Sequence, residues 1–196
     1  MKFIGEHPAL DLVNTVGGWS ADRFREDKLE NIGDLIRWAE LAKLIDAREA
    51  AALIRRTRSH PAEARGVLAR ARTLRGVLHR LFDCTLKRRE ARPADVAFLG
   101  NALRAARRHY TLTARDHEFV WRWDQRPSLD SILWRVTQSA ADLLTSPDLG
   151  RLRRCAGADC GWMFLDTTRN HSRHWCDMKD CGNLAKVRRF RARRAE

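Results

Sequence analysis

Residues 153–194 read RRCAGADCGWMFLDTTRNHSRHWCDMKDCGNLAKVRRFRARR and hold four of the five cysteines of the chain. Cys155 and Cys160 lie five positions apart, as do Cys176 and Cys181, with fifteen residues between the two pairs. Zinc prefers four ligands at the corners of a tetrahedron, and pairs of thiolates on tight turns provide them. The spacing therefore predicts one structural zinc ion per chain, bound by these four cysteines.

Two other uses of these residues stay open from the residues alone. The four thiols could form two disulfides, although a reducing cytosol favours metal binding by paired cysteines. Either His171 or His174 could replace a thiolate in a catalytic zinc site, although four thiolates leave no open position for a substrate. Cys84 has no cysteine near it in sequence and lies in an apolar helical pattern, so we expect it in the core.

The local structure around the cysteines can also be predicted. We expect residues 162–175 to form a β-hairpin with Arg169 and Asn170 at its turn. A helix should begin at or just after Cys181. Helical periodicity then allows Leu184 and Val187 to turn back toward the zinc.

The segment after the last cysteine is strongly basic, with the sequence GNLAKVRRFRARR. On a helix, Lys186, Arg189 and Arg193 would share one face. Three further cations widen this face: Arg188, Arg191 and Arg194. A basic helix held by a metal site suits phosphate contact or insertion into the major groove of double-stranded DNA.

A solvated basic tail and an RNA-binding finger remain alternatives to the DNA-binding interpretation. Cation contacts alone do not distinguish the two nucleic acids. Trp162 and Trp175 could stack on RNA bases, although a small zinc module needs such aromatic residues for its own core.

The charge distribution supports an anionic partner. The chain has a formal net charge of +13 and a calculated pI near 10.7. From residue 151 onward, twelve Lys or Arg stand against five Asp or Glu, which is a surplus of seven. Since over half of the excess lies in the last quarter of the chain, the basic patch is predicted to lie on one element.

The rest of the chain is mainly helical in pattern, so the predicted fold class is mainly α with one β-hairpin. The strongest helical signal covers residues 61–89, where leucines recur on a single face over many turns. Between residues 109 and 123 the apolar period changes to two, which predicts a hairpin with one apolar face. Further helices are expected within 7–16, 30–45, 46–57, 93–103 and 127–144.

The first residues, MKFIGEHPALDLVNTVGG, do not resemble a signal peptide, because Glu6 and Asp11 interrupt the apolar stretch. No run approaches the roughly 18 to 20 apolar residues of a membrane span. We therefore expect a cytoplasmic protein that does not enter a membrane.

The last segment resembles the CGNR-type zinc finger, because both cysteine pairs, FLDTTRN, RHWC and AKVRR occur in the expected order. Upstream, HPALDLVNTV is similar to the start of the ABATE domain. The resemblance implies an ABATE-like sensing domain over residues 1–149 and a small treble-clef-like zinc module over 150–196. It also implies a bacterial transcription regulator that responds to stress. The family tetrapeptide ends in Arg, and Leu184 stands at that position here. If that Arg contacts a phosphate in relatives, this chain has lost the contact or shifted it to Lys186 or Arg188.

The residues upstream of the finger do not identify an effector. Asp11 and Asn14 lie among apolar neighbours and are candidates for binding a small-molecule effector, or for capping the backbone instead. No catalytic triad, phosphate-cradling glycine loop or His/Glu metal pair can be identified from the sequence, so we do not expect an enzyme. The alternative is a small-molecule-binding protein or an enzyme in which the finger is purely structural. A homodimer would be ordinary for such a regulator, but no coiled-coil seam predicts one.

Overall fold

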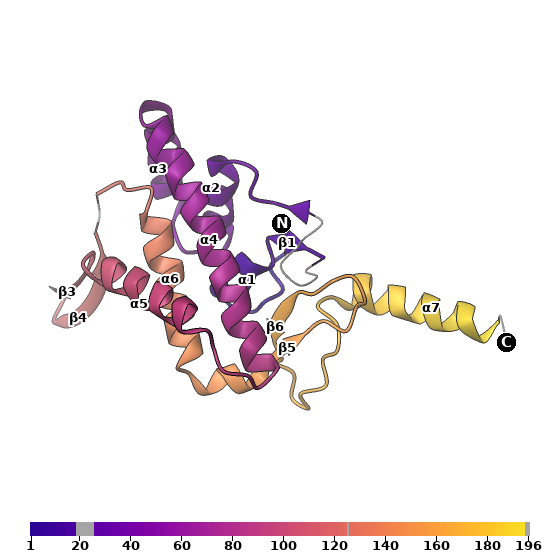
Figure 1. The fold of residues 1–196 in the computed structure, drawn as a ribbon. Helices are drawn as coiled ribbons and strands as arrows, with labels where there is room; N and C mark the ends of the chain where they lie inside the picture. Colours follow the sequence, from indigo (N-terminus) through magenta and orange to yellow (C-terminus); the bar gives the residue numbers. More distant parts are fainter. Residues whose placement is uncertain (19–25, 125, 195–196) are drawn as a thin grey trace. The chain divides into compact units, whose positions relative to one another are not determined.

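The computed structural model describes residues 1–18, 26–124 and 126–194 (Figure 1). The chain folds into two compact units. Residues 29–146 form the helical unit, and residues 1–28 together with 147–196 form the finger unit.

The helical unit consists of five helices and one β-hairpin. Its helices are α2 (Ile32–Leu41), α3 (Ala47–Ser59), α4 (Pro61–Leu86), α5 (Pro93–Arg107) and α6 (Ser131–Leu144). The predicted long core helix is confirmed as α4, which buries Leu68, Leu74, Leu78 and Leu81. Helices α5 and α6 pack against each other and carry Leu99, Val136 and Ala140 into the core.

The helix boundaries follow from local chemistry. Asn31 and Asp34 form a capping box at the start of α2, where each side chain accepts from the backbone of the other residue. Asp46 caps α3, since its carboxylate accepts a 2.7 Å hydrogen bond from the Glu49 N–H. Pro61 and Pro93 begin α4 and α5, at a position where the missing N–H has no helical partner to lose.

The predicted hairpin is present as β3 (Tyr110–Arg115) and β4 (Glu118–Trp123), which pair antiparallel. Its two-residue turn places Asp116 and His117 at φ of 50° and 69°. Turns with two positive φ values match the right-handed twist of the strands, and Asp tolerates the first position. The fold class predicted from the sequence, mainly α with a β-hairpin, is therefore confirmed.

The finger unit combines short elements from both ends of the described chain. The N-terminal part supplies α1 (Pro8–Val13), β1 (Val16–Gly17) and β2 (Glu26–Asp27). The C-terminal part supplies a 3₁₀ turn, η1 (Pro147–Arg151), strands β5 (Leu152–Arg154) and β6 (Met163–Leu165), the π-turn η2 (Met178–Gly182) and α7 (Asn183–Arg193).

One local prediction for the finger is wrong. Strand β6 pairs with β5, in the register Leu152↔Leu165 and Arg154↔Met163, and no hairpin forms within 162–175. The first cysteine pair therefore lies at the end of a hairpin rather than before one. Residues 166–175 form an ordered loop because the side chain of Asp166, described below, binds its backbone. A hairpin with a cysteine knuckle, followed by a helix, fits the expected treble-clef-like module.

The packing units differ from the two sequence segments 1–149 and 150–196, because residues 1–18 and 26–28 group with the finger. Asn14, Val16 and Ile4 all contact residues beyond 160.

A helix that crosses a bilayer needs about 20 predominantly apolar residues. Among residues 1–18, 26–124 and 126–194, no helix combines the length and the apolarity that a membrane span needs.

Candidate metal centre and basic helix

The first cysteine pair lies on the turn between β5 and β6. Cys155 follows β5, and its N–H donates to the Trp162 carbonyl at 2.8 Å, which closes the turn. The Cys160 N–H donates to the Gly157 carbonyl at 3.1 Å. A Cβ atom at Gly157 would lie 3.2 Å from both Cys160 Cβ and Cys181 Sγ, so a side chain here would crowd the cysteine cluster. Gly161 has a φ of 70°, a value that favours glycine.

The second pair is placed by the loop before α7. Cys176 is buried, and Cys181 lies in η2 directly before the helix. The carboxylate of Asp177 accepts a 2.8 Å hydrogen bond from the Lys179 N–H and so caps η2. A Cβ atom at Gly182 would lie 2.5 Å from Met178 Sδ, so a side chain here would displace the Met178 side chain.

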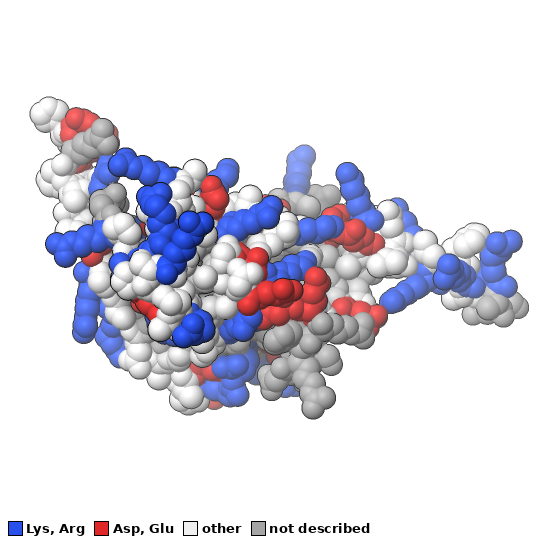
Figure 2. Space-filling model, turned by 90° about the horizontal axis from the view of Figure 1, so that it is seen from above, with Lys and Arg blue, Asp and Glu red and all other residues white. Residues whose placement is uncertain are grey.

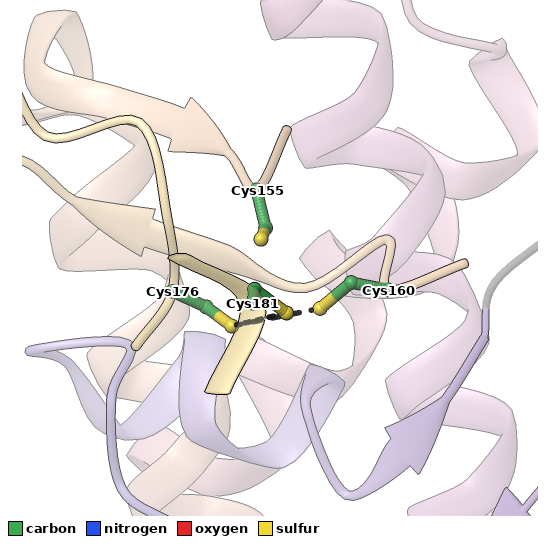
Figure 3. Close-up of side chains that lie close together, drawn as sticks. All are labelled: Cys155, Cys160, Cys176 and Cys181. Atoms are coloured by element: carbon green, nitrogen blue, oxygen red, sulfur yellow. Dashed lines mark hydrogen bonds between the residues drawn. The ribbon is translucent and has the colours of Figure 1, made fainter. Parts of the chain in front are cut away.

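The four cysteine side chains converge on one point (Figure 3). All four Sγ atoms lie within 4.8 Å of one another. The Sγ atom of Cys176 is 3.6 Å from that of Cys160 and 3.5 Å from that of Cys181. Tetrahedral zinc with Zn–S bonds of about 2.3 Å requires sulfur atoms about 3.8 Å apart. The donor set therefore fits zinc in number, type and spacing, and the separations are too long for disulfide bonds.

The thiols are electrostatically coupled. Hydrogen bonds from Cys160 and Cys176 lower the pKa of the Cys155 thiol to about 2. The same Cys155 interaction raises the pKa of Cys160 to about 12 and raises that of Cys176 strongly, and burial raises the pKa of Cys181. One thiolate is thus favoured and further thiolates are opposed. A divalent cation removes this opposition, because it attracts all four sulfur atoms in their ionised form.

Other cysteine and histidine candidates lie apart from this cluster. The Nδ1 atom of His171 lies 3.3 Å from the Asp166 carbonyl oxygen, and neither His171 nor His174 belongs to the cluster. Cys84 is half-buried rather than fully buried, and its thiol donates to the Leu81 carbonyl within α4 at 3.0 Å.

Asp166 and Arg173 hold the two halves of the metal centre together, and sequence reasoning did not single them out. Asp166 is fully buried and accepts from the Thr168 hydroxyl and from the Thr168 and Arg173 N–H groups. These hydrogen bonds, the Thr168 hydroxyl first, lower its pKa. The Arg173 guanidinium lies 4.2 Å from the centre of the Phe164 ring and donates to the Cys176 carbonyl at 2.6 Å. The motif FLDTTRN could have indicated the role of Asp166, because it contains this residue.

Asp11 and Asn14, the candidate effector residues, form hydrogen bonds with backbone groups of the finger unit. The Asn14 amide donates to the Met163 carbonyl at 2.8 Å and accepts from the Met163 N–H at 2.9 Å. Asp11 is buried and accepts from the Gly5 N–H at 2.9 Å, while burial raises its pKa to about 6. Backbone capping was the alternative to ligand binding for both residues. Effector binding by Asp11 and Asn14 stays a prediction without support from these contacts.

Trp162 also has a structural role. Its indole N–H donates to the Val16 carbonyl at 2.6 Å, and the Lys28 ammonium lies 4.9 Å from the ring centre. Both Trp162 and Trp175 pack against the small core of Cys155, Phe164 and Cys176. The preference for core packing over base stacking is consistent with these contacts.

Helix α7 presents the predicted cations to solvent. Between Asn183 and Arg193 no residue is buried, and the segment contains no acidic residue. All six candidate side chains are exposed: Lys186, Arg188, Arg189, Arg191, Arg193 and Arg194. Arg188 reaches Asp159 at 3.4 Å, and Arg194 lies 5.2 Å from the centre of the Phe190 ring. Figure 2 shows blue side chains along this helix.

The expectation that Leu184 and Val187 turn back toward the zinc holds for Leu184 and is wrong for Val187. Leu184 lines a cavity of about 620 Å³ together with Cys160, Cys176 and Cys181, although its side chain is 59% exposed. Val187 is 45% exposed and does not line this cavity. Other residues on the wall of the cavity are Trp162, Trp175, Arg188 and Arg189.

Comparison with known protein families gives two matches. Residues 6–147 match ABATE, which carries the description "Putative stress-induced transcription regulator". Residues 151–194 match the CGNR zinc finger. No curated protein matches the chain. The finger match and the four-cysteine cluster together identify one structural zinc ion in the chain.

Proposed function

We propose that this chain, which belongs to the ABATE family and carries a CGNR zinc finger, is a transcription regulator that binds double-stranded DNA through α7. The observation that carries the proposal is the exposed segment 183–194, which holds six cations and no acidic residue and begins two residues after the zinc ligand Cys181. The zinc ion is structural in this proposal, since four thiolates complete its tetrahedron.

The metal centre prepares α7 for an anionic partner. Cys181 lies in the turn from which α7 starts, so the zinc fixes the origin and direction of the helix. Four thiolates and one Zn²⁺ leave about two negative charges beside the helix N-terminus, where the helix dipole favours them. The cations lie farther along the helix, so their charge remains available to phosphates.

The dimensions of α7 fit the proposal. A helix of 11 residues is about 16 Å long, and the major groove of B-DNA is about 12 Å wide and admits one α-helix. Lys186, Arg189 and Arg193 recur at intervals of three and four residues, so they follow one line along the helix. A line of cations suits a run of phosphates along one strand.

The response to an effector or to stress is proposed for the remainder of the chain. Support comes from the description of the family, which names a stress-induced regulator. RNA binding, and an enzyme with a purely structural finger, are the alternatives that the experiment below separates.

The test is selection of bound fragments from genomic DNA by the full-length, zinc-loaded chain. Lys186, Arg189 and Arg193 are replaced together by Ala in one variant. The matched control replaces Arg55, Arg58 and Arg65, which are exposed on α3 and α4, and so removes the same charge. We expect a defined motif with the wild type and the control, and none with the α7 variant.

Two results would contradict the proposal. Equal enrichment by both triple variants would mean that α7 does not carry recognition. Preferential retention of single-stranded RNA over duplex DNA, measured by competition at one salt concentration, would favour the RNA-binding alternative.

A further inference from the structure

The β3–β4 hairpin has one face made only of apolar or aromatic residues. Its register pairs Tyr110 with Trp123, Leu112 with Trp121, and Ala114 with Phe119. Side chains of directly opposed residues lie on the same side of a sheet, and every second residue repeats that side. These six residues, called the aromatic face below, therefore form one continuous surface.

The aromatic face is unusually exposed for side chains of this size. Phe119 is 76% exposed, Trp121 58% and Leu112 49%. Tyr110 stacks between the two tryptophans, with ring centres 5.2 Å from Trp121 and 4.4 Å from Trp123. Stacking orders the rings but leaves their outer surfaces in water. Exposed apolar patches of this kind mark contact sites for other molecules.

The charge of the aromatic face narrows the class of partner. None of its six residues is charged, although the chain as a whole carries +13. The opposite face of the hairpin bears Thr111, Glu118 and Arg122. A nucleic acid would need available cations at the contact, whereas the cation recorded against this face, Arg135 at 5.9 Å from the Trp123 ring centre, is bound to Glu49 at 2.9 Å. Two copies of the chain repel each other through their net charge, and here they could meet without opposing like charges.

We propose that the aromatic face is a self-association surface, which packs against the same face of a second copy of this chain. A two-fold axis makes such a contact self-complementary, because each residue meets its symmetry mate or the mate's neighbour. The two hairpins would stack as two small sheets about 10 Å apart, with the rings interdigitated between them.

The available area sets the strength of the dimer. A fully buried Phe or Trp contributes about 150–250 Å² of surface, so the exposed parts of Phe119, Trp121 and Leu112 amount to roughly 400 Å² per chain. A pair then buries roughly 800 Å², which is below the range of stable complexes. The dimer should therefore be reversible and depend on protein concentration. The proposal does not rest on DNA binding and is tested without DNA.

The experiment is sedimentation equilibrium of the zinc-loaded, full-length chain up to about 200 µM. Phe119→Glu places a charge on the aromatic face, and Thr111→Glu places the same charge on the opposite face, beside its cross-strand partner Arg122. We expect Phe119→Glu to weaken association at least about 30-fold, because burial of an unpaired carboxylate is costly. Thr111→Glu should change the association constant by less than about threefold. Circular dichroism and melting curves establish that both variants fold like the wild type.

Three results would overturn the proposal. The wild type could stay monomeric over the whole concentration range. Alternatively, Phe119→Glu and Thr111→Glu could associate equally, which would place the contact elsewhere. In a third outcome, a monomeric wild type could bind vesicles of equal phosphatidylglycerol and phosphatidylcholine while Phe119→Glu does not, which would assign the aromatic face to a membrane surface.

Discussion

Replacement of Asp11 by Asn should stabilise the protein at neutral pH and much less in acid. Asp11 is buried, 7% exposed, and burial raises its pKa from 3.8 to about 6. The folded state therefore binds the proton more tightly than the unfolded state. The ionised form of Asp11 therefore destabilises the fold. This loss of stability grows as the pH rises from about 4 to about 6. Asn keeps an oxygen that can accept from the Gly5 N–H, which is now 2.9 Å from the carboxylate.

The magnitude follows from the two pKa values. A difference of about two pKa units corresponds to about 3 kcal/mol at pH 7.5, where the group is ionised in both states. At pH 5 the same relation gives about 1.6 kcal/mol. Asp11→Asn should therefore gain up to about 3 kcal/mol in the free energy of unfolding at pH 7.5, and about 1.4 kcal/mol less at pH 5.

The assay is urea unfolding of the zinc-loaded chain at pH 5, 6 and 7.5, with wild type and variant side by side. Other groups, such as Asp166 and Asp177, have lowered pKa values and lose stabilising charge toward acid. They do so in both proteins, so the difference between variant and wild type isolates Asp11. A difference that does not change between pH 5 and 7.5, or a variant less stable at pH 7.5, would refute the reasoning.

Three further predictions concern the metal, the helix and the packing units. Purified protein should contain one zinc per chain, Cys84→Ser should keep it and Cys155→Ser should lose it, as measured by elemental analysis; zinc loss from Cys84→Ser would be contrary evidence. Leu184→Arg restores the family tetrapeptide on an exposed site of α7, so the variant should bind a DNA duplex more tightly and with a steeper salt dependence. Its zinc content should be unchanged. An unchanged affinity would count against a phosphate contact at this position. The fragment 29–146 should give a helical circular dichroism spectrum and a cooperative melt, because its core is complete within that range, and a disordered fragment would show that the finger unit is needed.

Much of the fold and of the metal site could be predicted because both depend on local patterns. The leucine period of α4 specifies which face of the helix is buried. The alternation in β3–β4 specifies which residues lie on one face of the hairpin. The structure has both elements. The four cysteines could be assigned together because their paired spacing needs no knowledge of the rest of the chain. The structure brings their Sγ atoms to within 4.8 Å of one another.

The remaining features depend on contacts between residues far apart in sequence. The pairing of β6 with β5 could not be anticipated, since the turn that joins them is held by the cysteine knuckle. Asn14 meets Met163 across 149 positions, which no local pattern encodes. The position of Leu184 beside the cysteine cavity and the exposure of Val187 also depend on tertiary structure, since both follow from the direction in which α7 leaves the finger.

The most direct test of the central claim is the salt dependence of duplex binding by the full-length, zinc-loaded chain. The wild type, the triple α7 variant and the triple α3/α4 control are titrated onto one duplex, and the logarithm of the binding constant is plotted against the logarithm of salt concentration. Each phosphate contact contributes about 0.9 to the slope, so loss of Lys186, Arg189 and Arg193 should reduce its magnitude by about 2.7. The control should leave the slope unchanged. Equal slopes for all three proteins, or no duplex binding by a wild type with intact zinc, would contradict DNA binding through α7.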